Sequence, residues 1–195
     1  MDVQNQEKVY RQGKRRIALT GNIASGKSTV LKILEQRGYR ILDTDEVSHE
    51  LLTVNNKELF ETFKDCDVFE NKEFSRLKLG KLVFNDEFLR KKLEAILHPQ
   101  IAEKIQKFEG IVAVPLLFEA KMEHLFDKII MIYADDEIRL KRLMKRNNFT
   151  EREARARIAS QISQDEKIKR CDYVIYNNGL IDELTDKVCD IIKQV

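Results

Sequence analysis

One stretch of the sequence, GNIASGKS at residues 21–28, constrains the possible folds of this chain more than any other. It follows the pattern G-x-x-x-x-G-K-[ST], comes after the apolar run Ile17–Thr20, and opens a segment with helical spacing. Its glycines let backbone amides approach phosphate oxygens, and the positive end of the following helix dipole attracts their charge. The stretch therefore predicts a strand–loop–helix unit that binds the phosphates of a nucleotide.

Individual residues of this unit have predicted roles in binding ATP. Lys27 would reach the β- and γ-phosphates and assist catalysis, and the Ser28 hydroxyl would hold Mg²⁺, the predicted cofactor. The remaining residues would surround the phosphates mainly through their backbone. The predicted ATP contacts in this unit are Gly21, Asn22, Ile23, Ala24, Ser25, Gly26, Lys27, Ser28 and Thr29.

Further apolar runs alternate with helical patterns along the chain. Near-continuous apolar runs are typical of strands that are buried on both faces of a parallel sheet. We therefore expect an α/β fold with a doubly wound, mainly five-stranded parallel sheet, closed by a helix from Leu180 to Val195. The runs after the first are YRILDTD (39–45), GIVAVPLL (110–117), DKIIMIYA (127–134) and CDYVIYNNG (171–179).

Two segments exceed what a minimal sheet needs. About sixty residues separate the second and third strands, where a crossover needs about a dozen, and their apolar spacing is helical. A second helical segment is basic, and its Thr150 and Glu153 form a capping-box pattern. We expect a nucleotide-binding core (15–48, 109–136 and 170–195), a helical substrate-binding insertion (49–108), a lid (137–169) and a polar tail (1–14).

Composition bears on the cellular compartment and the classes of partner that we expect for this chain. Among its 195 residues, the formal net charge is only +2, which does not favour a polyanionic partner. Three scattered cysteines, Cys66, Cys171 and Cys189, fit a reducing compartment. The first residues lack an apolar signal-peptide core, and no apolar run approaches membrane-spanning length. We expect a cytoplasmic protein with no membrane or nucleic-acid partner.

Residues outside the loop indicate which class of nucleotide-binding protein with such a loop this chain resembles. A regulatory GTPase would need D-x-x-G and N-K-x-D motifs, which are missing, and a helicase would usually carry a strand that ends in Asp-Glu. A small kinase needs a carboxylate near the acceptor hydroxyl, an acceptor pocket and lid arginines. Asp43 or Asp45, at the end of the second predicted strand, could supply the carboxylate, although either could instead cap a helix.

Two alternatives stay open at this level. A related small-molecule or nucleoside monophosphate kinase would use the same parts. A phosphate-loop switch or ATPase, whose helical insertion binds a protein partner, would hydrolyse nucleotide without an acceptor. A nucleic-acid-binding function would rest only on the arginines of the lid, because basic helix faces are usually just solvated.

Six motifs in this order resemble the dephospho-CoA kinase family. They are LTGNIASGKST (19–29), ILDTDEVSHELL (41–52), LHP (97–99), VPLLFEA (114–120), RLMKRNNFTEREARARIASQ (142–161) and DYVIYNNG (172–179). The resemblance covers nearly the whole chain from Arg16. It implies ATP-dependent phosphorylation of the ribose 3′-hydroxyl of dephospho-CoA, which gives CoA and ADP in the final step of coenzyme A biosynthesis. It implies ATP and dephospho-CoA as partners and no obligate protein partner, and it leaves an oligomer open.

The resemblance also assigns roles by position. Asp45 matches the catalytic base, and Arg142, Arg146 and Asn178 match positions on the ATP side. Arg157 and Gln161 match the R-x-x-x-Q signature of the lid, and His98 belongs to the LHP motif, where a proline-set turn between helices is the alternative reading. The residues expected to bind the acceptor are Asp45, Arg76, His98, Leu116, Glu119, Arg157 and Gln161.

Two positions depart from the family pattern. Asn22 stands where a second glycine is usual, and we expect the loop to survive because asparagine tolerates a positive φ better than most residues. Ala113 stands where an acidic residue is frequent, so any support that this acid gives to magnesium must come from Asp43, Asp45 or Glu119.

Overall fold

The computed structural model describes residues 15–195, so the predicted polar tail lies outside the described residues. The chain divides into two compact units, one formed by residues up to 42 together with 108–195 and the other by residues 43–107. The predicted lid belongs to the same unit as the sheet. The predicted boundaries of core, insertion and lid stay predictions at this finer level.

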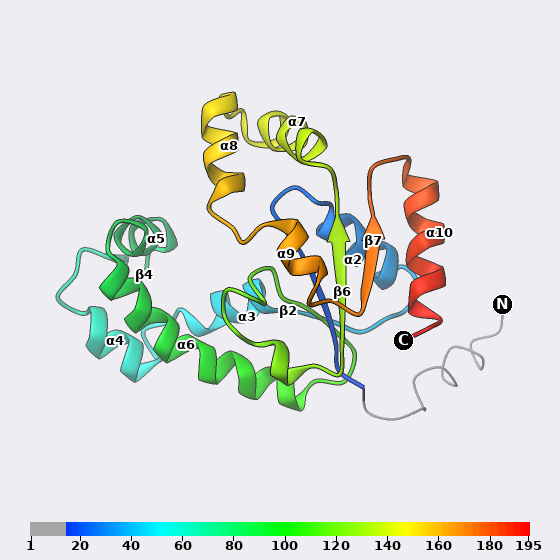
Figure 1. The fold of residues 1–195 in the computed structure, drawn as a ribbon. Coiled ribbons are helices and arrows are strands. Elements are labelled where there is room, and N and C mark those ends of the chain that lie inside the picture. Colours follow the sequence, from blue (N-terminus) through cyan, green and yellow to red (C-terminus); the bar gives the residue numbers. More distant parts are fainter. Residues whose placement is uncertain (1–14) are drawn as a thin grey trace. The chain divides into compact units, whose positions relative to one another are not determined.

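The predicted doubly wound sheet is confirmed, with five strands in the order β2-β5-β1-β6-β7 (Figure 1). β1 pairs in parallel with both β5 and β6, and β6 pairs in parallel with β7. Each strand lies within one of the five apolar runs. The strands are β1 (Ile17–Gly21), β2 (Ile41–Asp43), β5 (Ile111–Ala113), β6 (Lys128–Tyr133) and β7 (Tyr173–Tyr176).

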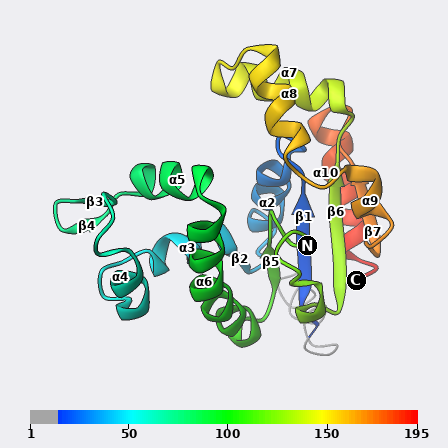
Figure 2. The ribbon, with the colours of Figure 1, turned by 60° about the vertical axis from the view of Figure 1, so that its left-hand side comes forward.

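Helices cover the sheet and extend beyond its carboxyl edge. α2 (Lys27–Glu35) and α10 (Ile181–Ile192) contact each other and pack on the sheet, whereas α9 (Gln164–Ile168) packs on β6 (Figure 2). Leu19, Leu34 and Ile130 are among the fully or almost fully buried residues of this core. α7 (Asp136–Asn147) and α8 (Glu151–Ala159) make up most of the predicted lid, called the lid segment below. A short 3₁₀ helix, η1 (Glu123–Leu125), precedes β6.

The second unit is mostly helical, with α6 (Glu87–Lys107) packed against its three other helices. Its core contains Leu59, Phe63 and Ile96. It also holds a small hairpin that the sequence analysis did not predict, with Asn71 and Lys72 at φ 50° and 68° in the turn. The elements are α3 (Thr44–Leu51), α4 (Lys57–Phe63), β3 (Phe69–Glu70), β4 (Glu73–Phe74), α5 (Arg76–Asn85) and α6.

Local rules explain several boundaries. Thr150 and Glu153 form the expected capping box at the start of α8, with reciprocal bonds between side chain and backbone. Gly38 follows α2 at φ 82°, a conformation that favours glycine. The reading of His98–Pro99 as a turn between helices is wrong, because α6 continues through Pro99. Ile96, Leu97 and Ile101 are buried on either side of the proline and hold the helix in place despite its missing donor.

No helix among residues 15–195 combines the length and the apolar character that a membrane span requires.

Candidate functional site

The loop between β1 and α2 has the geometry of an anion-binding nest. Gly26, the N-cap of α2, lies at φ 99° and ψ 19°, and Ala24 lies at φ 62°. Left-handed residues in such a turn point successive backbone amides toward one place. A side chain at position 26 is excluded twice, by its φ and by the Asn177 amide, whose Nδ2 would lie 2.0 Å from an added Cβ.

Within residues 15–195, the N-terminus of α2 receives neither a side-chain cap nor an acidic residue in its first turn. Most other helices among the described residues are compensated there, although α5 is not. Thr150 caps α8 and Ser163 caps α9, and both helices carry acidic residues in the first turn. The first amides of a helix have no partner within the helix, and their positive potential is strongest at this end. The start of α2 is therefore suited to a bound anion such as a phosphate group.

Asn177 and Arg142 support the loop on the side of β7. The Asn177 Nδ2 donates to the Ser25 carbonyl at 2.8 Å, and this asparagine is buried. Arg142 donates through Nη2 to the Asn177 carbonyl at 3.0 Å and through Nη1 to the Ser25 carbonyl at 3.4 Å. These bonds place the Arg142 guanidinium beside Gly26, with its Nη1 3.8 Å from where a Cβ would lie. A fixed positive charge next to the nest strengthens its preference for anions.

The lid segment holds the other side of the loop. Arg139 donates from Nε to the Ile23 carbonyl at 3.0 Å and pairs with Asp136 at 2.8 Å. Its side chain is only 2% exposed, and this burial lowers the pKa of Arg139, while the nearby Asp136 carboxylate opposes that change. The Ile23 amide donates to the Gln161 Oε1 at 2.8 Å. The backbone of one loop residue is thus held by two side chains of the lid.

The left-handed residues of the loop are Ala24 and Gly26, and Asn22 has no positive φ. The expectation that the loop accepts Asn22 because asparagine tolerates a positive φ is therefore wrong. Its side chain is buried instead, and its Nδ2 donates to the Ile162 carbonyl at 2.9 Å. Ala113, the other departure, is fully buried in β5. A charged side chain there would be costly to bury without a partner.

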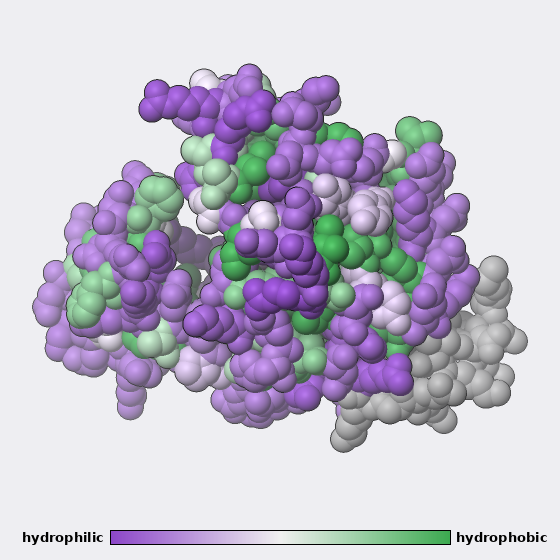
Figure 3. Space-filling model, viewed as in Figure 1, coloured by the Kyte–Doolittle hydropathy of each residue, from purple (hydrophilic) through white to green (hydrophobic). Residues whose placement is uncertain are grey.

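The predicted ATP contacts outside the loop have different environments. Arg146 is exposed at the end of α7 and donates to the neighbouring Asn147. Asn178 exchanges two hydrogen bonds with Asp135, at 2.8 and 2.9 Å, and so joins the end of β7 to the start of α7. Arg157 is exposed in the last turn of α8. Hydrophilic residues cover most of the outer surface of the lid helices, at the top of Figure 3.

The segment after β5 carries two predicted acceptor contacts. Leu116 is 49% exposed, whereas Leu117 and Phe118 are buried. The Glu119 Oε1 lies 2.7 Å from the Nζ of the fully buried Lys167, and it accepts from the Ile162 amide at 3.3 Å. Glu119 therefore forms a partly buried ion pair that holds the end of the predicted lid segment.

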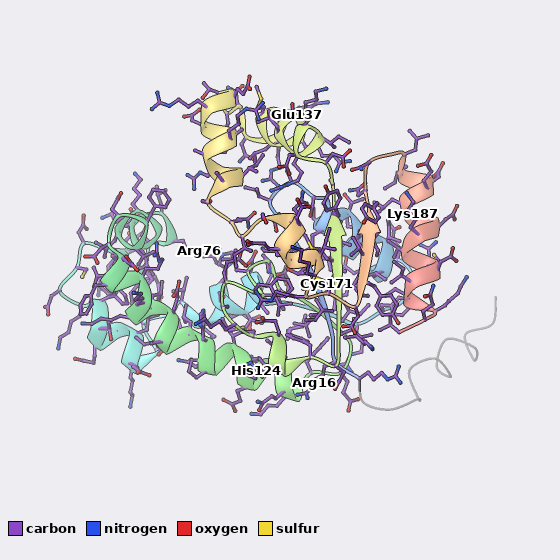
Figure 4. The ribbon with its side chains drawn as sticks, viewed as in Figure 1. Arg16, Arg76, His124, Glu137, Cys171 and Lys187 are labelled. Atoms are coloured by element: carbon purple, nitrogen blue, oxygen red, sulfur yellow. The ribbon has the colours of Figure 1, made fainter. Side chains whose placement is uncertain are left out.

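The helical unit holds four of the predicted residues. Asp43 is the N-cap of α3 and accepts a hydrogen bond from the Asp45 amide at 2.9 Å, so the helix-cap reading of Asp43 is confirmed. Asp45 is exposed in the first turn of α3. Arg76 is exposed at the start of α5 (Figure 4), and His98 is half-buried in α6.

Sequence reasoning counted Arg139 among the candidate lid arginines but did not predict its contact with the loop, and it missed Asn177 and Lys167. The buried position of Arg139 had a signal, because it lies four residues before Leu143 and so on the same apolar face of α7. Asn177 stands beside Asn178 in the sequence, and the pattern alone does not say which of two asparagines faces the loop. A fully buried lysine has no sequence signal, because lysine is almost always exposed unless it is paired.

Magnesium fits the donors at the start of α2. Among residues 15–195, no three His, Cys, Asp or Glu side chains form a metal cage. Mg²⁺ usually keeps several waters and takes phosphate oxygens with one or two protein ligands, so it needs no such cage. The exposed Ser28, in the first turn of α2, offers one hydroxyl beside the nest.

Comparison with known proteins identifies relatives along almost the whole chain. The dephospho-CoA kinase family model matches residues 15–183. A dephospho-CoA kinase from Geobacillus kaustophilus is 41% identical over 191 residues, covering 91% of this chain and 95% of the relative. Another from Listeria monocytogenes is 39% identical over 191 residues and covers 91% and 96%.

Solved structures agree with these sequence matches. The crystal structure of TT1252 from Thermus thermophilus has a TM-score of 0.80 at 31% identity and covers 94% of this chain and 99% of its own. A dephospho-CoA kinase from Campylobacter jejuni has a TM-score of 0.68 at 32% identity and covers 92% and 96%. A shikimate kinase from Acinetobacter baumannii, at a TM-score of 0.58, 16% identity and coverage of 96% and 97%, shares the fold.

Proposed function

The chain belongs to the dephospho-CoA kinase family, a family of ATP-dependent kinases, and on this premise we propose how its residues carry out the reaction. The γ-phosphoryl group of ATP is transferred to the ribose 3′-hydroxyl of dephospho-CoA. A bond forms between the hydroxyl oxygen and the γ-phosphorus, the bond to the leaving ADP oxygen breaks, and the hydroxyl proton passes to a base. The products are CoA and ADP.

The observation that carries the nucleotide half of this proposal is the start of α2, which has a left-handed Gly26 and no side-chain cap within the described residues. The loop amides hold the β- and γ-phosphates, and Lys27 neutralises charge on them as the transferred group moves. Arg142 adds positive charge beside Gly26. Arg146 and Asn178 complete the ATP side, the latter through its bonds to the start of α7.

Ser28 is proposed as the protein ligand of Mg²⁺, which when bound neutralises phosphate charge and orients the leaving group. The exposed hydroxyl at the first turn of α2 supports this assignment. The cation and ATP would enter together, because most of the remaining ligands are phosphate oxygens and water.

Asp45 is proposed as the base that receives the hydroxyl proton. It stands two residues after Asp43, the last residue of β2, so chain connectivity ties it to the carboxyl end of a sheet strand. Asp43 is occupied as a helix cap, which leaves Asp45 as the better candidate of the two. An exposed carboxylate in the first turn of a helix can accept a proton during attack.

The acceptor contacts divide into two groups by environment. Arg76, His98, Leu116 and Arg157 are exposed or half-buried, and we assign them direct contact with the acceptor. Glu119 and Gln161 already bond within the protein, so we assign them the positioning of the lid segment that carries Arg157. The same activity suggests the cytoplasm as the place of action, because ATP is abundant there.

The proposal is tested by ADP release with dephospho-CoA, AMP, CMP or shikimate as the acceptor, at fixed Mg²⁺ and ATP. We expect ADP release to depend on dephospho-CoA, with CoA formed in equal amount. Equal rates with AMP or shikimate, or the same rate with no acceptor, would overturn the proposed function. ADP formation without an acceptor would instead favour an ATPase.

A further inference from the structure

Two hydrogen bonds join the phosphate loop to the segment that ends the lid. The Asn22 Nδ2 donates to the Ile162 carbonyl at 2.9 Å, and the Ile23 amide donates to the Gln161 Oε1 at 2.8 Å. Two consecutive loop residues therefore meet two consecutive residues about 140 positions further along the chain. We name this pair of bonds the loop–lid latch.

The Asn22 side chain is the unusual half of the latch. The residue is 3% exposed, and its Oδ1 is buried with no hydrogen-bond partner among the described residues. Burying an amide oxygen without a partner is unfavourable. The Nδ2 bond to Ile162 therefore has to be made for this side chain to be tolerated here. A glycine at this position could neither make that bond nor leave an oxygen unpaired.

The lid segment is fixed on its other side by the core. The Ile162 amide donates to Glu119 at 3.3 Å, and Glu119 pairs at 2.7 Å with Lys167, which is fully buried. Ile162 is thus held by its carbonyl to the phosphate loop and by its amide to the segment after β5.

The lid helices also rest on the tip of the loop. Ile23 and Ala24 pack against an apolar cluster that contains Leu140 and Leu143 of α7 and Ala154 of α8. Beside this contact lies a cavity of about 380 Å³, lined by Asn22 and by residues of α8 such as Arg155 and Ile158. The lid is therefore joined to the loop at defined points, with a cavity beside them.

We propose that Asn22 is a positioning residue that transmits the occupancy of the phosphate loop to the lid. When phosphates order the loop amides, the latch draws residues 161–162 with the loop and so sets the position of the arginines of α8. This inference rests on the proposed function and deepens it. Its consequence is that the latch keeps the lid closed on bound ATP, so that water is excluded until the acceptor is present.

The variant Asn22→Asp tests the latch directly. It keeps the shape of the side chain but replaces the donor by a carboxylate oxygen that repels the Ile162 carbonyl. Asn22→Ala removes the donor without a new charge, and Asn22→Gly serves if the aspartate variant does not fold. The matched control is Asn85→Asp, because the Asn85 Nδ2 also donates to a backbone carbonyl, that of Lys81 at 2.9 Å, in an exposed helix end.

The measured quantity is the ratio of ADP release without acceptor to ADP release with dephospho-CoA. A loss of folded protein lowers both rates equally and leaves the ratio unchanged. We expect the ratio to rise about 2- to 10-fold in the Asn22 variants, the factor that corresponds to one hydrogen bond, and to stay at the wild-type value in Asn85→Asp. An unchanged ratio in Asn22→Asp and Asn22→Ala would overturn the proposal.

A second measurement separates this inference from the proposed function. ADP is added to the protein, and the rate of trypsin cleavage within residues 137–169 is followed by mass spectrometry. We expect ADP to slow cleavage in the wild type and to slow it less in Asn22→Asp. If dephospho-CoA is not phosphorylated but ADP still protects the variant less than the wild type, the proposed function is wrong and the loop–lid latch is supported. Equal protection by ADP in wild type and variant would overturn the latch.

Discussion

The Asn177 Nδ2 donates a 2.8 Å hydrogen bond to the Ser25 carbonyl and so joins the end of β7 to the phosphate loop. The same asparagine offers its own carbonyl to Arg142. The loop conformation is therefore determined by residues about 150 positions away as well as by its own glycines.

This contact makes Gly26 the most sensitive position of the loop. In Gly26→Ala, the new Cβ would lie 2.0 Å from the Asn177 Nδ2, at a φ of 99° that alanine rarely adopts. We expect ADP and ATP to bind at least tenfold more weakly, because the amides of the nest lose their alignment. Isothermal titration with ADP measures this change. Gly80→Ala is the control, since an added Cβ there meets nothing within 4 Å.

Replacement of Asp45 by asparagine should separate binding from chemistry. The carboxamide keeps the size of the side chain but cannot accept the hydroxyl proton. We expect turnover with dephospho-CoA to fall by about two or more orders of magnitude, with ADP affinity nearly unchanged. Steady-state kinetics and ADP titration check the two parts. Near-normal turnover would show that Asp45 is not the base. Glu46→Gln, on the same helical turn, is the control.

Arg139 is expected to support both stability and the loop. Arg139→Met removes the donor to the Ile23 carbonyl and the ion-pair partner of Asp136, which keeps its hydrogen bond from Gln164, while it retains apolar volume. We expect the free energy of unfolding to fall by about 2 kcal/mol and the KM for ATP to rise. Urea unfolding and ATP kinetics measure these effects. Arg155→Met, at an exposed arginine paired with Glu137 and Glu151, should change little.

Asp172 should make stability depend on pH. Burial alone would raise the pKa of Asp172, but hydrogen bonds from Lys128 and the Ile129 amide, both at 2.8 Å, hold this pKa below its ordinary value of 3.8. A lowered folded pKa contributes stability above the unfolded pKa, and this contribution is lost as pH falls through the folded value.

Asp172→Asn should therefore lower the free energy of unfolding by about 0.5–1 kcal/mol at pH 7, a range that allows for partial solvent screening of the pair. Below about pH 4 the difference between variant and wild type should shrink, because Asp172 becomes protonated in the wild type. Urea unfolding at pH 7 and pH 3 measures the difference in free energy of unfolding between the variant and the wild type. A difference that is equal at both pH values would contradict the lowered pKa of Asp172. Asp190→Asn, at an exposed carboxylate, is the control.

Cys171 should be the least reactive cysteine of the folded chain. Burial raises the pKa of its thiol to about 12, so very little thiolate is present at pH 8. The thiol also lies 3.1 Å from the Lys167 carbonyl, in the segment before β7 (Figure 4). We expect iodoacetamide to modify Cys171 more slowly than Cys66 and Cys189 at pH 8, as followed by mass spectrometry. The difference should vanish in denaturant.

The sequence alone was sufficient for the five strands and for the capping box of α8, because both follow from local patterns. It was not sufficient for the hairpin of β3 and β4. Its strands have two residues each, and Lys72 stands in a left-handed turn position that sequence rules give to glycine. Pro99 was misleading for a similar reason, because the packing of α6 outweighed the usual effect of proline.

The sequence by itself predicted that the chain binds a nucleotide through residues 21–28 and indicated which family it resembles, since both inferences depend on residue types at fixed spacing. The tertiary structure alone decided which side chains hold that loop. Arg139, Asn177 and Asn22 reach it through contacts between residues far apart in the chain. The physical reason is that a buried polar group must find its partner in space, and that partner is set by the packing of the sheet and lid rather than by sequence neighbours.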